Sequence, residues 1–194
     1  MKINFVAIDY GAVLAGTTAA SFCVQGILQT IQTSKGENAD IWLQDFVIKG
    51  SFSKVYIDAP LSLPGSYVGK GVDFHYREAD RTLRAMSPMF LGGLTARTMK
   101  LANHLKKMNI STHEVYPAAF VKGNPEIHLL YNKKDRSSVT KTVDMLMKLL
   151  PVKLNSSPDN YHQLDSIICW YIGYKHLSGI ANVCGDSKEG VILY

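Results

Sequence analysis

Residues 53–64 read SKVYIDAPLSLP, and this short stretch decides the fold class. The run from Val55 to Ile57 is apolar and rich in β-forming side chains, which predicts a strand. Asp58 follows the strand directly, and Ala59-Pro60 then closes the segment as a turn. An acid placed immediately after a strand is typical of ligand sites in open α/β sheets.

Two upstream segments place this strand in a sheet. Residues 3–8 are rich in β-forming side chains and end at Asp9, and residues 40–48 carry apolar side chains at helical spacing before a stop at Gly50. A strand, a helix and a second strand in this order predict a right-handed crossover between parallel strands. We therefore expect Asp9 and Asp58 at the same edge of the sheet.

Further strands are predicted on either side of this unit. Residues 13–20 and 21–24 are interpreted as two strands that form an antiparallel meander with the first strand. Residues 111–116 predict another strand. If it also runs parallel, its Glu114 joins the two aspartates at one edge.

The rest of the chain alternates loops and helices. Residues 65–71 form a glycine-rich loop. Helices are predicted over residues 77–84, from Leu94 through Leu105, over residues 136–150, and from about Ser157 to His176 or Leu177. Residues 182–186 and 190–193 suggest a closing hairpin.

The composition is that of one ordinary globular domain spanning residues 1–194. The apolar fraction is 46% and the charged fraction 19%, and no repeat or linker divides the chain. No apolar run is long enough to cross a bilayer and the start does not resemble a signal peptide, so we expect a cytoplasmic protein with no membrane partner. Three scattered cysteines suggest neither disulfides nor a zinc site. The oligomeric state is left open, a homodimer included.

The strand-end acids are candidate ligands of a divalent cation. Mg²⁺ and Mn²⁺ prefer oxygen ligands, and two to four convergent carboxylates with an open face suit phosphate chemistry. Asp9, Asp58 and Glu114 are predicted at one edge. Each also has a plainer interpretation, because aspartates after strands are common turn formers and Glu114 could be a hydrogen-bonded core acid.

Asp165 is the fourth candidate. It lies on the last long helix, just ahead of the apolar run 167–172. An acid at the edge of so apolar a segment costs desolvation free energy unless a cation or hydrogen bonds compensate it. A metal ion shared with Asp9 and Asp58 would supply this compensation, whereas a first-turn acid stabilised by the helix dipole is the alternative.

Several blocks of the sequence, in order along nearly the whole chain, resemble an uncharacterised family of predicted nucleases with a ribonuclease H-like fold. The blocks are Ala7-Ile8-Asp9, residues 57–64, Arg77-Glu78-Ala79-Asp80-Arg81, Glu114-Val115-Tyr116-Pro117, Leu164-Asp165-Ser166 and residues 185–192.

This resemblance implies a ribonuclease H-like α/β fold, with a mixed five-stranded sheet of three antiparallel and two parallel strands flanked by helices. It also implies that Asp9, Asp58 and Asp165 bind the metal, with Glu114 as a further catalytic residue that holds a metal or orients water. The sequence departs from the ribonuclease H pattern because the helix over residues 40–48 has no glutamate, so Glu114 replaces that ligand or the ligand is absent.

Basic residues are the candidate substrate contacts. The net charge of +5 is compatible with a nucleic-acid partner. Arg77, Arg81, Arg84 and Arg97 could hold phosphates, although helix arginines more often pair with neighbouring acids such as Glu78. Residues 132–136 are interpreted as an exposed charged loop, with contact to nucleic acid as the alternative.

Histidine offers an alternative to carboxylate chemistry. His162 lies one helical turn from Asp165, so the two could bind a transition metal or supply a general base. A histidine on a helix surface is more often inert.

Three functions are compatible with these residues. The first is a Mg²⁺- or Mn²⁺-dependent nuclease, a hydrolase of phosphodiester bonds in DNA or RNA. The second is a module that binds or hydrolyses nucleotide phosphates, because related folds use similar strand-end acids. The third is a non-catalytic interaction domain.

Overall fold

The strand β1 (Phe5–Asp9) lies at the centre of the sheet in the computed structural model, which describes residues 4–194. It pairs antiparallel with β2 (Ala19–Val24) and parallel with β4 (Lys54–Asp58). Beyond these, β3 (Ile27–Gln32) is antiparallel to β2, and β5 (Ser111–Val115) is parallel to β4. The predicted crossover between parallel strands is therefore present.

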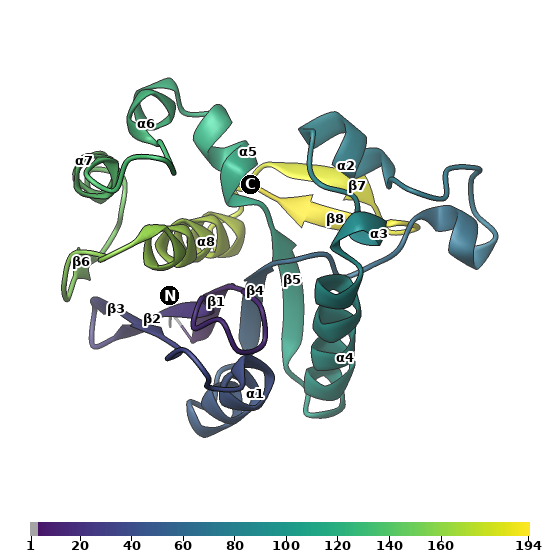
Figure 1. Ribbon diagram of the computed structural model, residues 1–194, viewed down its shortest axis with the longest axis horizontal. Helices are drawn as coiled ribbons and strands as arrows, with labels where there is room; N and C mark the ends of the chain where they lie inside the picture. The colour runs from purple at the N-terminus through teal and green to yellow at the C-terminus, as the bar shows by residue number, and fades with distance from the viewer. Residues whose placement is uncertain (1–3) are drawn as a thin grey trace.

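Three more strands extend this sheet, so the expected count of five is wrong. The closing hairpin, β7 (Val183–Asp186) and β8 (Gly190–Leu193), joins the sheet because β8 runs parallel to β5. The short strand β6 (Lys153–Leu154) pairs with β3 at the other end. The structure is thus a mixed α/β fold with one open sheet of eight strands in the order β6-β3-β2-β1-β4-β5-β8-β7 (Figure 1).

The two strands that follow β1 begin later in the chain than predicted. Residues 13–16 form a turn, and the second strand starts only at Ala19. The strand reverses at Gln25-Gly26, where both residues have positive φ, 50° and 81°. Two consecutive left-handed residues give the tight turn whose twist matches that of a hairpin. The third strand therefore begins at Ile27 and not at Ser21.

Helices cover both faces of the sheet (Figure 1). One face carries α8 (Tyr161–Leu177) together with α5 (Pro117–Lys122), α6 (Pro125–Leu130) and α7 (Ser138–Met147). The other face carries α1 (Ala39–Lys49) and α4 (Gly93–Lys107). Shorter turns lie between β4 and α4: a 3-10 turn at Gly65–Val68, α2 (Glu78–Leu83) and α3 (Pro88–Leu91).

The side chains of β1 alternate between two hydrophobic cores. Phe5 and Ala7 pack on the α8 side, where Phe5 stacks on Trp170 at 5.4 Å between ring centroids. Val6 and Ile8 pack on the side of α1 and α4. Successive residues of a strand point to opposite faces, so this pattern fixes the direction of every later residue in β1. Asp9 consequently points to the α8 face.

The helix α8 is the central element of its core. It begins at Tyr161, because the side chain of Asn160 accepts hydrogen bonds from the backbone N–H groups of His162 and Gln163. The predicted start near Ser157 is therefore a few residues early. Gly173 allows close packing on β4, since a Cβ atom there would lie 2.7 Å from the ring of Tyr56. None of the helices within residues 4–194 has the length and apolar character needed to cross a membrane.

Candidate active site

Asp9 and Asp58 lie side by side at the carboxyl ends of β1 and β4. They are register partners in the parallel ladder, as are Ala7 and Tyr56 one pleat earlier. Because Ala7 and Tyr56 belong to the core under α8, both aspartates point to the α8 face. The sequence expectation that these two acids share an edge is met.

The carboxylate of Asp58 has no hydrogen-bond partner among residues 4–194. Burial raises its pKa well above the ordinary value, and the nearby charges of Asp9 and Asp165 raise it further. The ammonium group of Lys133 acts in the opposite direction. A cation bound next to the Asp58 carboxylate would therefore stabilise its ionised form.

Asp9 has one partner from α8. Its Oδ2 atom lies 2.7 Å from Nδ1 of His162, and this hydrogen bond raises the pKa of the imidazole. The His162 ring is half exposed, whereas the Asp9 carboxylate is mostly buried. The histidine therefore joins the acid cluster through Asp9, and not through the His162–Asp165 pair considered from the sequence.

Asp165 reaches the same site from α8 and is only 2% exposed. Its Oδ1 accepts a hydrogen bond from the Tyr131 hydroxyl at 2.6 Å, and its Oδ2 lies 2.7 Å from Nζ of Lys133. Burial nevertheless raises the pKa of Asp165 to about 6, against the influence of Lys133. The ammonium group of Lys133 thus supplies a positive charge that partly offsets the cost of burying the Asp165 carboxylate.

Lys133 and Tyr131 contact Asp165, a role that the sequence does not predict for either residue, although nucleic-acid contact is an alternative for the loop that contains Lys133. Both belong to the segment between α6 and α7, of which residues 132–136 were interpreted as an exposed charged loop. The Lys133 side chain is 60% exposed, with its ammonium group over the Tyr131 ring. Burial lowers its pKa, but Asp165, Asp9 and Asp58 outweigh this and raise it. No hydrophobic periodicity marks this segment, so only the tertiary structure reveals it.

Glu114 lies on the opposite face of the sheet from Asp9 and Asp58. It pairs in register with Ile57, and Ile57 packs on the side of α1 and α4. Its carboxylate accepts hydrogen bonds from both terminal nitrogens of Arg77, at 2.6 and 2.8 Å, and from the backbone N–H of Leu61. Glu114 is thus hydrogen-bonded, as in the alternative interpretation, and strand alternation turns it away from Asp9 and Asp58, although it lines the same cleft as they do.

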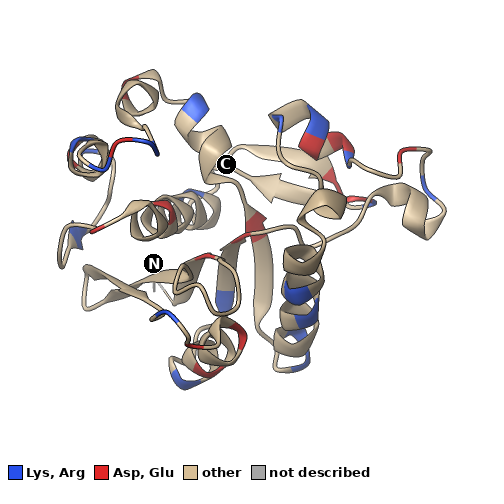
Figure 2. Ribbon diagram, viewed as in Figure 1, with Lys and Arg blue, Asp and Glu red and all other residues tan. Residues whose placement is uncertain are grey.

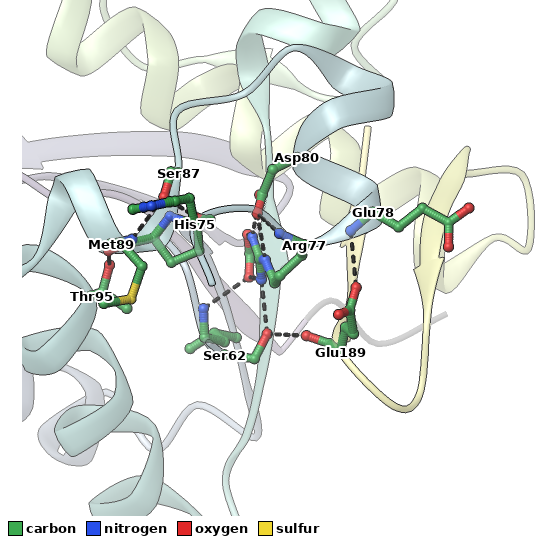
Figure 3. A network of polar contacts seen from close by, with 12 residues as sticks. Ser62, His75, Arg77, Glu78, Asp80, Ser87, Met89, Thr95 and Glu189 are labelled. Atoms are coloured by element: carbon green, nitrogen blue, oxygen red, sulfur yellow. Dashed lines mark hydrogen bonds and ion pairs between the residues drawn. The ribbon is translucent and has the colours of Figure 1, made fainter. Parts of the chain in front are cut away.

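Arg77 is committed to the interior of the protein. It is 1% exposed and donates to Asp80, Glu114 and Ser62 through Nε and both terminal nitrogens (Figure 3). These five contacts match the five N–H groups of a guanidinium. No donor is left for a phosphate, so we do not retain Arg77 as a substrate contact.

The other candidate arginines are also paired, though less deeply. Arg97 donates to Asp40 and to the backbone oxygen of Gly11, and its guanidinium lies over the Tyr10 ring. Arg81 pairs with Asp73 on the surface, where its side chain is 61% exposed. An exposed pair of this kind is weak and exchanges partners readily. Neither arginine lines the cleft beside Asp9 and Asp58: Arg81 lines a hollow next to α2, and Arg97 lines one between α1 and α4.

A cleft of about 380 Å³ borders the acid cluster. Asp9, Asp58 and Lys133 line it together with apolar side chains that include Met86, Leu91 and Leu94. A larger hollow of about 580 Å³ lies between α2 and the β7–β8 hairpin, and neither Asp9 nor Asp58 lines it. We place the candidate site in the smaller cleft, because both Asp9 and Asp58 line it.

The side chains as they stand do not form a closed metal cage. Within residues 4–194, no group of three or more His, Cys, Asp and Glu side chains is arranged to hold a metal ion. Three hydrogen bonds occupy these acids: His162 contacts Asp9, and Tyr131 and Lys133 each contact one oxygen of Asp165. The pair Asp9 and Asp58 still offers carboxylate oxygens to a hard cation.

Basic segments lie on two sides of the strand ends. Figure 2 shows Lys and Arg along α4 and in the segment that precedes α7, with acidic residues at the strand ends between them. A polyanion could therefore contact basic side chains on both sides of the acid cluster.

No protein-family model, curated protein or solved structure matches this chain. The chemistry of the site is therefore inferred from its own side chains: a pair of adjacent strand-end carboxylates, one of them without a partner, next to a buried third acid and a lysine.

Proposed function

We propose that the protein is a Mg²⁺- or Mn²⁺-dependent hydrolase of phosphodiester bonds in nucleic acid. The observation that carries this proposal is the register pairing of Asp9 with Asp58, with the Asp58 carboxylate unpartnered and its pKa raised by Asp9 and Asp165. Concentrated negative charge of this kind costs folding free energy, and a divalent cation would offset that cost.

The residues fit a hard divalent ion. Mg²⁺ is usually held by one or two protein carboxylates and completes its shell with waters and substrate phosphates. Asp9 and Asp58 would hold the ion, and Asp165 would bind it directly or through water. When bound, the ion supplies a polarised phosphoryl oxygen and a water of lowered pKa.

The chain's own side chains perform the remaining steps. Lys133, exposed at the rim of the cleft, places a positive charge where the scissile phosphate enters. Tyr131 keeps Asp165 in place through its hydroxyl hydrogen bond. His162 holds a proton shared with Asp9 at Nδ1 and can pass it to the leaving oxygen. On the opposite face of the sheet, the ion pair between Glu114 and Arg77 links the end of β5 to the start of α2.

The order of the central strands supports this proposal. The five strands β3-β2-β1-β4-β5 comprise an antiparallel meander followed by two parallel strands, which is the arrangement expected of a ribonuclease H-like sheet. The sequence blocks that resemble predicted nucleases of that fold include the same three aspartates. A fold hosts many functions, so the site carries the proposal and the fold only supports it.

Cleavage of a nucleic-acid panel tests the proposal. Labelled single-stranded and duplex DNA and RNA are incubated with Mg²⁺, with Mn²⁺ or with EDTA, and ATP hydrolysis is measured in parallel. We expect metal-dependent cleavage that Asp58→Asn abolishes. Asp45→Asn is the matched control, because Asp45 is exposed on α1 and pairs only with Lys49. ATP turnover without cleavage would identify a nucleotide-phosphate module instead, and inactivity on every substrate would contradict the enzyme assignment.

A further inference from the structure

The cleft beside the acid cluster has two chemically different parts. Its charged part is lined by Asp9, Asp58 and Lys133, and also by Arg77, Asp80 and Glu114, which are paired with one another. The segment from Ala85 to Leu94 contributes Met86, Leu91 and Leu94, which are apolar. With a divalent cation held by Asp9 and Asp58, as proposed above, a ligand that fills this cleft would carry a phosphate at one end and a flat or apolar group at the other.

Met86 is the most exposed of these apolar side chains. It is 60% exposed although it lines the cleft, and it precedes Ser87, which caps the first turn of α3. Methionine adapts its shape to a partner and makes favourable contacts with aromatic rings. An exposed methionine at the rim of a cleft is thus suited to cover a nucleobase.

The size of the cleft limits what can enter it. Its volume of about 380 Å³ lies near the lower end of the range for small-molecule pockets, which is about 300–1,000 Å³. One nucleotide unit fits this space. A base inside a duplex is stacked and paired, so it would have to leave the duplex to enter. Recognition by a site of this kind requires a base that is free of its partner.

Apart from Lys133, the Tyr116 hydroxyl is the cleft donor with no hydrogen bond among residues 4–194, and because a hydroxyl both donates and accepts it does not by itself select one base. All five N–H groups of Arg77 are used within the protein, and the Tyr10 hydroxyl donates to Asp40. Apolar and stacking contacts tolerate every base, because each base has a flat π face.

We propose that this cleft seats one unpaired nucleotide next to the scissile phosphate, so that the substrate is a single-stranded polynucleotide bound without strong base preference. This inference rests on the proposed function for the position of the phosphate. The base contacts Met86, Leu91 and Leu94, and its phosphate lies toward Lys133 and the two aspartates.

A binding experiment tests the subsite separately from the chemistry. Fluorescein-labelled ten-nucleotide oligothymidylate and a blunt hairpin duplex with the same label are titrated with Asp58→Asn protein and, in EDTA, with the wild-type protein. Fluorescence anisotropy gives both dissociation constants. We expect oligothymidylate to bind about tenfold more tightly than the duplex, which is the range of one base-stacking contact.

The variant Met86→Glu places a negative charge at the rim of the cleft and should weaken oligothymidylate binding about tenfold. Phe90→Glu is the matched control, because it adds the same charge at a side chain that is similarly exposed, at 64%, yet does not line the cleft. Unchanged thermal unfolding of both variants shows that the fold is intact.

The outcomes separate the two proposals. Equal or tighter binding of the duplex, no binding of either probe, or a Met86→Glu variant that binds normally would overturn the subsite. If cleavage then occurs on duplex substrates, the proposed function stands without the subsite. If oligothymidylate binds preferentially and depends on Met86 but nothing is cleaved, the subsite stands and the proposed chemistry is wrong.

Discussion

Replacing Asp165 by asparagine should make the metal-free protein more stable. Its carboxylate is 2% exposed, and its pKa is raised from 3.8 to about 6. The folded state therefore binds this proton more tightly than the unfolded state. Above pH 6 the ionised group costs folding free energy, and the cost disappears as the pH falls below about 4. Asparagine keeps the volume and can still accept the Tyr131 hydrogen bond.

The magnitude follows from the size of the shift. A shift of about two pKa units, at about 1.4 kcal/mol each, corresponds to about 3 kcal/mol. The lost contact with Lys133 reduces this gain only slightly, because that side chain is 60% exposed. We expect Asp165→Asn to raise the free energy of unfolding by about 1–3 kcal/mol at pH 7.5, which for a chain of this length raises Tm by about 3–10 °C.

Urea unfolding and thermal scans of both proteins in EDTA, at pH 7.5 and pH 4, provide the measurement. The stability difference should be present at pH 7.5 and absent at pH 4. An Asp165→Asn protein that is less stable than the wild type at pH 7.5 would refute the reasoning. In that case the ion pair with Lys133 stabilises the fold, and Asp165 is a structural residue.

Three further predictions concern other parts of the molecule. Arg77→Met should lower the free energy of unfolding by about 3–5 kcal/mol in urea denaturation, because it leaves Glu114 and Asp80 buried without a cation; a loss below about 1 kcal/mol would contradict the structural role of the arginine. Burial lowers the pKa of His113 to about 4, so the unfolded state binds this proton at higher pH than the folded state does. As the pH falls from 6.5 to 4, the free energy of unfolding of the wild type should drop by up to about 3 kcal/mol more than that of His113→Leu. Parallel pH profiles of the two proteins would exclude this cause. Binding of oligothymidylate should weaken steeply between 50 and 200 mM salt, by about tenfold or more, because phosphate contacts release counterions; salt-independent binding would argue against a nucleic-acid ligand.

The sequence predicts the pair Asp9 and Asp58 because their placement depends on one robust rule. A strand, a helix and a strand in one sheet cross over with a fixed hand, which makes the strands parallel and brings their carboxyl ends together. The same pattern does not give the register of β5. Whether Glu114 points toward the aspartates or away from them depends on that register, and a shift of one residue reverses the answer. The structure pairs Glu114 with Ile57, which turns it away.

The surroundings of Asp165 show a different limit. Burial of an acid ahead of residues 167–172 predicts that a partner exists, since an unpaired buried charge is too costly. It does not predict which partner. Lys133 and Tyr131 come from a segment between two short helices, and their approach depends on how α6 and α7 pack on α8. In the same way, the two-residue strand β6 and the pairing of β8 with β5 depend on contacts between segments far apart in the sequence.

Direct measurement of Mn²⁺ binding tests the central claim that Asp9 and Asp58 hold a divalent cation. Isothermal titration calorimetry of the metal-free protein with Mn²⁺ gives affinity and stoichiometry for the wild type, Asp9→Asn, Asp58→Asn and the control Asp45→Asn. We predict saturable binding by the wild type and the control, at one or two ions per chain, and a loss of at least about tenfold in affinity for each of the other two variants. Equal Mn²⁺ binding by Asp58→Asn and the wild type, or no saturable binding by the wild type, would contradict the metal site.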